Sequence, residues 1–250
     1  MADCKPLSTP MEQNLKLSSN DSSDLVDATS YRRLVGSLIY ATTTRPDISF
    51  SVGVLSRFMQ QPRETHWLVA KRVLRYLQGT QNYGLKYSKI SKFSLLSYSD
   101  SDYAGDMDDG KSTSGYLMSL GSAVISWKSK KLLVPTLSSA EAKYIATSEA
   151  TREILWLQRI LADLQAPQAS STPLFIDNQS TIKMAKNPVF HDRTKHINTK
   201  FHFIRHYVKD GSISLQYCAT IDQPEDILTK ALGRVKFENF REMIGLTPSD

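Results

Sequence analysis

The hydrophobic pattern of this chain changes its period at residue 93, and this change limits the possible folds more than any other feature. Residues 93–98, 115–120 and 124–127 are short β-prone runs separated by turn sequences, which predicts three antiparallel strands. The longest amphipathic run follows at about residues 140–164, where large aliphatic side chains recur at helical spacing. Three strands followed by a long helix indicate a sheet that is covered by helices.

The elements that follow extend this sheet. We predict a strand at 174–176, helices near 181–185 and 200–208, a strand at 212–217 and a helix from Pro224. Strands that alternate with helices favour parallel pairing. The predicted fold class is therefore α/β, with a mixed five-stranded sheet of three antiparallel and then two parallel strands, flanked by helices.

The residues before the first predicted strand differ in character. The beginning of the chain is polar and rich in turn-forming residues, which predicts a linker. Three helices are predicted next, at 31–43, 47–59 and 64–77, with a proline interrupting the first pair. The predicted divisions are a polar linker at 1–30, a small helical segment at 31–92, the α/β domain at 93–235 and a C-terminal helix or tail at 236–250.

The net charge of +6 is concentrated in residues 1–92, which hold 13 of the 31 Lys and Arg residues but only 7 of the 25 Asp and Glu residues. The excess is greatest at 63–92. Basic side chains bind phosphates without reading sequence, so we predict that Lys71, Arg72 and Arg75 contact nucleic acid. The alternative is a solvated helix face, which is the usual role of such a charge run.

A second group of lysines adjoins an aromatic residue. Lys128, Lys130 and Lys131 follow Trp127, and a ring beside cations suits a nucleic-acid backbone with stacked bases. These lysines are therefore further predicted nucleic-acid contacts. The alternative is that they form the ordinary end of a strand.

Four acidic residues lie where an α/β fold gathers ligands. Asp100 and Asp177 come at the carboxyl ends of two predicted strands, Glu141 opens the long helix, and Asp226 begins the last one. Two Mg²⁺ ions that promote phosphodiester hydrolysis need hard oxygen ligands from several elements. We therefore predict that these four residues are catalytic and bind metal.

Each acid also has a local explanation. Glu141 lies in a capping-box sequence, Asp177 suits a helix N-cap, Asp226 suits the positive end of a helix, and Asp100 suits a turn. Asp102 is predicted to support the metal ligands from the layer behind them.

The sequence around these acids resembles the RNase H domain of copia-type LTR retrotransposon Pol polyproteins. The segments that carry this resemblance are LSSAEAKYIA (137–146), FIDNQS (175–180), NPVFHDRTKHI (187–197) and DILTKAL (226–232). Upstream, CKPLSTPM (4–11), YRRLVGSLIY (31–40) and TRPDISF (44–50) are similar to the connection segment between that family's reverse transcriptase and its RNase H. The resemblance covers nearly the whole chain and identifies it as a polyprotein fragment.

The resemblance implies an RNase H-like fold and endonucleolytic hydrolysis of the RNA strand of RNA/DNA hybrids. It implies two Mg²⁺ ions, with Mn²⁺ as a substitute, and Asp100 shared by both. Glu141 and Asp177 would serve the ion at the scissile phosphate, and Asp226 the ion that activates water. Many RNases H carry a histidine on the loop before the last acid, whereas residues 218–225 contain none.

The implied partners are an RNA/DNA hybrid and the reverse transcriptase portion of the same polyprotein, with no membrane. Only Cys4 and Cys218 are present, and no signal-peptide or membrane-spanning pattern occurs, so an intracellular and not a secreted location is predicted. The alternative function is that of an inactive or domesticated remnant, which keeps the fold and binds nucleic acid or a partner without catalysis. Retention of all four acids favours the enzyme.

Overall fold

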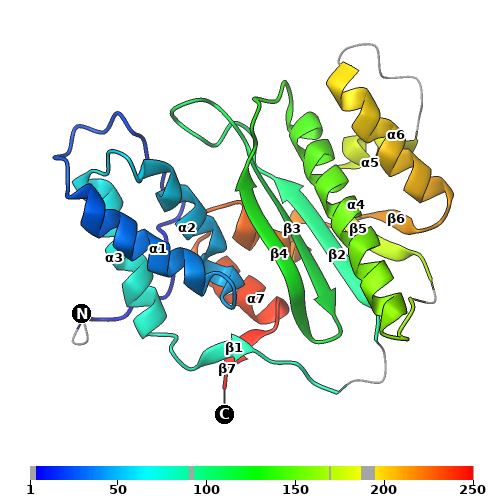
Figure 1. Ribbon diagram of the computed structural model, residues 1–250, viewed down its shortest axis with the longest axis horizontal. Helices are drawn as coiled ribbons and strands as arrows, with labels where there is room; N and C mark the ends of the chain where they lie inside the picture. The colour runs from blue at the N-terminus through cyan, green and yellow to red at the C-terminus, as the bar shows by residue number, and fades with distance from the viewer. Residues whose placement is uncertain (1–3, 90–92, 169, 187–194, 250) are drawn as a thin grey trace.

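The central sheet separates two groups of helices in the computed structural model, which describes residues 4–89, 93–168, 170–186 and 195–249 (Figure 1). The N-terminal helices lie on one side of the sheet, and the helices within residues 139–209 lie on the other (Figure 1). Within the described ranges, no helix is both long enough and apolar enough to cross a membrane.

The sheet has the strand order β4-β3-β2-β5-β6. Strands β2 (Leu95–Ser101), β3 (Thr113–Leu120) and β4 (Ala123–Lys131) form an antiparallel meander. Strand β5 (Thr172–Ile176) pairs in parallel with β2, and β6 (Ile213–Tyr217) pairs in parallel with β5. The predicted α/β fold, with a mixed five-stranded sheet of three antiparallel and then two parallel strands, is confirmed.

Helix α4 (Ser139–Asp163) covers one face of this sheet, accompanied by α5 (Gln179–Lys186) and α6 (Lys195–Lys209) (Figure 1). Helix α4 begins where the Ser138 hydroxyl accepts a hydrogen bond from an amide of the first turn. Side chains alternate along β3, so every second one faces this helical layer. The core between sheet and helices contains Leu95, Tyr116, Met118, Tyr144, Ile154, Leu174, Ile176 and Ile204.

The opposite face of the sheet packs against the N-terminal helices α1 (Ala28–Ala41), α2 (Ser49–Leu55) and α3 (Glu64–Gln78). Short 3₁₀ helices at Pro46–Ile48 and Ser56–Phe58 flank α2, so all three helices predicted from the sequence are present. The core on this face draws on both ends of the chain and includes Tyr31, Val35, Leu55, Val73, Leu117, Val124, Phe237 and Phe240.

The C-terminal segment is more broken than predicted. The helix predicted from Pro224 is a five-residue 3₁₀ helix, η5 (Pro224–Leu228), and the α-helix α7 spans Arg234–Met243. All five residues of η5 are buried, so packing and not helical periodicity sets its length. The chain then forms β7 (Leu246–Pro248), which pairs with β1 (Tyr83–Leu85).

A buried polar network also ties the N-terminal helices to α7. The Arg45 guanidinium lies 2.7 Å from an Asp47 carboxylate oxygen, and the Tyr76 hydroxyl donates to the same carboxylate. Arg241 of α7 donates to the Tyr76 hydroxyl over 3.3 Å. Residues before and after the sheet thus share one apolar core and one polar network, while the predicted division into segments stays a prediction.

Candidate functional site

Strands β2 and β5 bring two of the predicted aspartates to the same edge of the sheet. The parallel register pairs Tyr98 with Phe175, and continuing it by two residues places Asp100 beside Asp177. Asp100 is fully buried, and the side chain of Asp177 is only 8% exposed. The carboxyl ends of these neighbouring parallel strands therefore place two carboxylates close together.

The 3₁₀ helix η5 contributes the third predicted aspartate, Asp226, which is also fully buried. Lys230 links Asp226 to Asp100, because the Lys230 ammonium nitrogen lies 2.6 Å from Asp226 Oδ1 and 2.7 Å from Asp100 Oδ2. Lys236, from the first turns of α7, lies 2.6 Å from the other oxygen of Asp226. Two ammonium groups thus flank Asp226.

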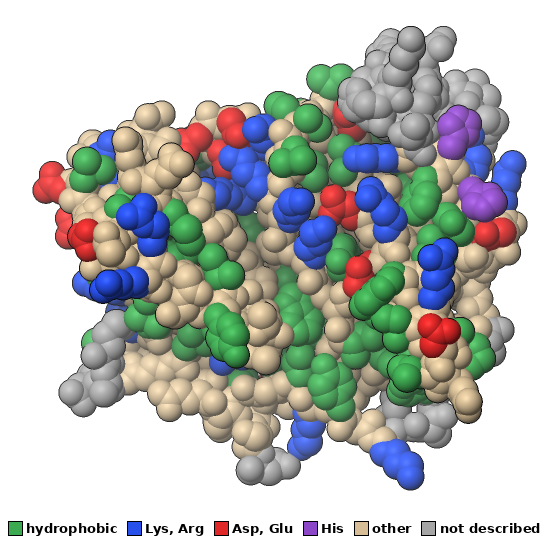
Figure 2. Space-filling model, in the orientation of Figure 1, with side chains coloured by type: hydrophobic (Ala, Val, Ile, Leu, Met, Phe, Trp, Pro, Cys, Tyr) green, Lys and Arg blue, Asp and Glu red, His purple; other side chains and the backbone are tan. Residues whose placement is uncertain are grey.

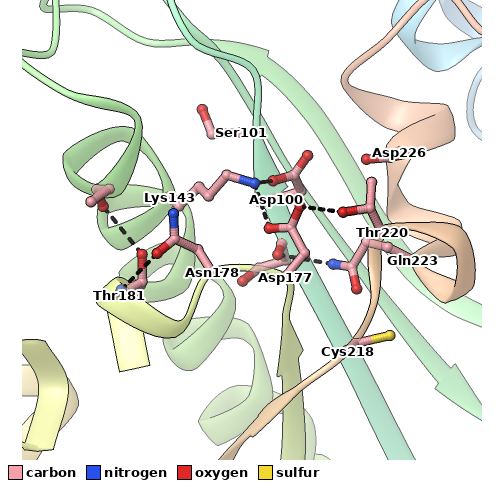
Figure 3. Close-up of polar contacts among 12 residues, drawn as sticks. Asp100, Ser101, Lys143, Asp177, Asn178, Thr181, Cys218, Thr220, Gln223 and Asp226 are labelled. Atoms are coloured by element: carbon pink, nitrogen blue, oxygen red, sulfur yellow. Dashed lines mark hydrogen bonds and ion pairs between the residues drawn. The ribbon is translucent and has the colours of Figure 1, made fainter. Parts of the chain in front are cut away.

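A third lysine links the two strand-end aspartates (Figure 3). The ammonium nitrogen of Lys143, on the first turns of α4, lies 2.5 Å from Asp100 Oδ1 and also pairs with Asp177. The Thr220 hydroxyl donates to Asp177 Oδ2 over 3.3 Å (Figure 3). Lys143 and Lys230 each lie between two carboxylates, where a bound cation would also be stabilised, whereas Lys236 pairs with Asp226 alone among the described carboxylates.

Burial and the lysine contacts shift the pKa values of the two buried aspartates in opposite directions. Burial by itself would raise the pKa of Asp100, but Lys230 and Lys143 outweigh burial and hold that pKa below its ordinary value. Burial dominates at Asp226, whose pKa is raised despite Lys230. The carboxylates raise the pKa values of Lys143 and Lys230 more than burial lowers them. The lysines thus favour the ionised form of Asp100, whereas burial favours the protonated form of Asp226.

The structure also brings in a residue that the sequence reasoning missed, Glu225. Its side chain is fully buried beside Asp100 and Asp226, and among the residues that the structure describes neither carboxylate oxygen has a hydrogen-bond partner. Burial, followed by the charges of those two aspartates, raises its pKa well above the ordinary value. Within the part of the chain that is described, Asp100, Glu225 and Asp226 are the acids whose oxygens converge within 4.8 Å of one another. In the sequence, adjacency to Asp226 was the only available signal.

Glu141 lies outside this convergent group. Its side chain accepts a hydrogen bond from the Leu137 amide at 2.8 Å, and its own amide donates to the Ser138 hydroxyl at 3.1 Å. The second bond is half of the capping box that the sequence left open as an alternative, but the Glu141 carboxylate reaches the amide one residue before the N-cap Ser138. Asp102 also stands apart, because its carboxylate accepts from the Thr113 amide, and burial raises its pKa to about 6.

The predicted nucleic-acid contacts on β4 differ in their surroundings. Lys128 lies 3.4 Å from Glu149. Lys131 lies 2.6 Å from Asp106 and 2.8 Å from Asp109, two residues of the acidic loop between β2 and β3. Lys130 is exposed. Figure 2 shows basic and acidic side chains intermixed on this face of the molecule instead of one continuous basic surface.

The predicted contacts on α3 meet the N-terminal segment. Arg72 lies 2.9 Å from Glu12, the Arg75 guanidinium donates to the Lys5 carbonyl at 2.8 Å, and Lys71 lies over the Trp67 ring. Internal contacts thus account for the two arginines at least in part, and phosphate binding by all three residues stays a prediction.

The chain is similar over nearly its whole length to the Pol polyproteins of several plant transposons. The retrovirus-related Pol polyproteins from transposons RE1 and RE2 of Arabidopsis thaliana are 44% and 43% identical over 247 and 246 residues, covering 99% and 98% of the chain. The corresponding polyprotein from transposon TNT 1-94 of Nicotiana tabacum is 41% identical over 253 residues. The chain spans only 17–19% of the length of these relatives. No family model matches it.

Solved structures are more distant. A foamy viral protease-reverse transcriptase in complex with double-stranded DNA has a TM-score of 0.49 at 12% identity, with 82% of this chain and 35% of that chain covered. LC11-RNase H1 in complex with an RNA/DNA hybrid has a TM-score of 0.40 at 13% identity, with 54% of this chain and 94% of that chain covered.

Proposed function

The chain belongs to the copia-type Pol polyproteins, and from this premise we propose that it is their ribonuclease H segment, which hydrolyses the RNA strand of RNA/DNA hybrids endonucleolytically. The observation that carries the proposal is the convergence of buried carboxylates from separate elements, led by Asp100 and Asp226. Such a set of hard oxygen donors suits Mg²⁺ and, as a substitute, Mn²⁺.

The residues present fit a divalent cation by two criteria. The donors are carboxylate oxygens, and those of Glu225 are buried without any hydrogen-bond partner, which is costly unless a cation or proton neutralises them. We propose that Asp100 and Asp226 hold one ion and that Asp100 and Asp177 flank the place of a second. Bound ions of this kind lower the pKa of water and neutralise charge on a phosphate. The role of Glu141 stays a prediction, since its carboxylate accepts a hydrogen bond from the Leu137 amide.

The protein's own lysines have a defined part in this scheme. Lys143 and Lys230 neutralise Asp100 in the structure and keep a fully buried carboxylate ionised. Asp100 and Asp177 would hold a cation at the place that the Lys143 ammonium occupies, and Lys143 would then be free to contact a phosphate oxygen. The substrate partner proposed is an RNA/DNA hybrid, whose RNA strand is distinguished by 2′-hydroxyls in the wide minor groove. The reverse transcriptase portion of the polyprotein is the proposed protein partner.

One observation favours a second function, that of a non-catalytic remnant which keeps the fold. Three ammonium groups form salt bridges with the aspartates, so lysine side chains offset much of the negative charge of the site. A protein that binds nucleic acid or a partner without catalysis needs the fold but no bound metal ion.

A cleavage assay separates the two functions. The full chain is incubated with a labelled RNA/DNA hybrid in Mg²⁺, in Ca²⁺ and in EDTA, beside Asp100→Asn and the matched surface variant Asp163→Asn. We expect cleavage of the RNA strand in Mg²⁺ alone by the wild type and Asp163→Asn, and none by Asp100→Asn, which has lost the shared ligand. Equal cleavage by Asp100→Asn would refute the proposed site, and inactivity of the folded wild type would establish the remnant.

A further inference from the structure

We propose that Glu225 is a ligand of the divalent cation, forming with Asp100 and Asp226 a three-carboxylate site on the side of the sheet that faces η5. The inference deepens the proposed function, since it adds a residue to the same site. It assigns to Glu225 a role that the sequence resemblance does not imply.

Burial without a partner is the first observation behind this assignment. Glu225 has no exposed surface, and neither of its carboxylate oxygens forms a hydrogen bond within the described part of the chain. Each of the two aspartates beside it has two lysine contacts. An unpaired buried acid among satisfied ones needs an explanation, and its oxygens already converge with those of Asp100 and Asp226.

Strand β3 provides the space that this carboxylate occupies. Gly115 pairs with Asp100 in the antiparallel ladder, so it lies directly beside the buried aspartate. A Cβ atom on residue 115 would lie 1.9 Å from Glu225 Oε1 and 3.1 Å from the Lys128 carbonyl oxygen. Any other residue at 115 would expel the Glu225 carboxylate, so the glycine keeps this third ligand in place.

The carboxylates of the site outnumber the lysines that contact them, so its net charge favours a cation. Asp100, Asp177, Glu225 and Asp226 carry four negative charges when ionised, and Lys143, Lys230 and Lys236 carry three positive ones. The described contacts of the lysines go to the aspartates and not to Glu225. A divalent ion next to Glu225 would therefore neutralise a carboxylate that forms no salt bridge with a lysine among the described residues.

The test measures cation binding directly, without cleavage as the readout. Mn²⁺ binding is followed by electron paramagnetic resonance, and Mg²⁺ binding by calorimetry, on the full chain and on Glu225→Gln. The matched control is Glu242→Gln, since Glu242 is exposed on α7. We expect Glu225→Gln to weaken Mn²⁺ binding at least tenfold and Glu242→Gln to leave it unchanged. Wild-type affinity in a folded Glu225→Gln would overturn the assignment.

Gly115→Ala provides an independent variant, because it displaces the Glu225 carboxylate and leaves every acid in the sequence. We expect it to weaken Mn²⁺ binding to a similar degree, with circular dichroism used to confirm folding of both variants. Unchanged binding in a folded Gly115→Ala would contradict the assignment. The proposed function is separable from it: Glu225-dependent Mn²⁺ binding without hybrid cleavage would refute only the nuclease, and cleavage with Glu225-independent binding would refute only the ligand.

Discussion

Replacing Lys143 by methionine tests whether its ammonium group holds the place of a cation. Methionine keeps most of the length and apolar surface of the lysine side chain but carries no charge. The Lys143 side chain is only 12% exposed, and it contacts both Asp100 and Asp177. Without it, Asp177 keeps the Thr220 hydroxyl and Asp100 keeps Lys230, while the two carboxylates repel each other.

The expected loss of stability follows from these contacts. Removing one partner of a buried ion pair costs about 3–5 kcal/mol, and the remaining contact of Asp100 with Lys230 places Lys143→Met at the lower end, about 3 kcal/mol. For a chain of this size, that loss lowers the melting temperature by roughly 6–12 °C. Mg²⁺ at about 100 times its dissociation constant restores about 2.7 kcal/mol if it binds in place of the ammonium.

Thermal unfolding in EDTA and across a Mg²⁺ titration measures both effects. Lys183→Met, on the exposed side of α5, controls for the general loss of a lysine. We expect Lys143→Met to melt well below the wild type in EDTA and to gain more from Mg²⁺ than the wild type does. Equal melting in EDTA, or equal Mg²⁺ shifts for Lys143→Met and wild type, would refute the reasoning.

Three further predictions follow from other parts of the structure. Burial raises the pKa of Asp102 to about 6, so the folded protein binds the Asp102 proton more tightly than the unfolded chain does. The free energy of unfolding should therefore fall as the pH rises from about 4 to 6. Asp102→Asn should abolish this fall in urea titrations at pH 4.5 and pH 7, and an unchanged pH profile would argue against it. Lys130→Ala should reduce the slope of log hybrid affinity against log salt by about 0.7–0.9, whereas an unaltered slope would mean that this exposed lysine contacts no phosphate. Deleting residues 1–92 should expose Leu117 and Val124 of the sheet and abolish cooperative melting, and a wild-type transition in the truncated chain would show that the shared core is dispensable.

The sequence by itself predicted the order and type of the main elements. Strand and helix periodicities depend on neighbouring residues, so the three antiparallel strands, the helix near 140–164 and the two later strands could be located from local pattern. The same reasoning placed Asp100 and Asp177 at strand ends, and parallel pairing of those strands brings the two residues together. The helix predicted from Pro224 was wrong in length and type, because this segment is a short 3₁₀ helix whose five residues are all buried.

The composition of the acidic site was decided only by the tertiary structure. Gly115 and Glu225 are far apart in sequence, and nothing in either local sequence indicates that one provides space for the other. From the sequence, Glu141 could bind a metal ion or cap its helix, and in the structure its carboxylate accepts a hydrogen bond from the nearby Leu137 amide. The positions of the lysines between the aspartates likewise depend on which faces of α4, η5 and β2 meet. Periodicity determines which side of an element is buried, but packing determines which charged groups lie within 3 Å of one another, and at that distance their charges govern pKa and cation binding.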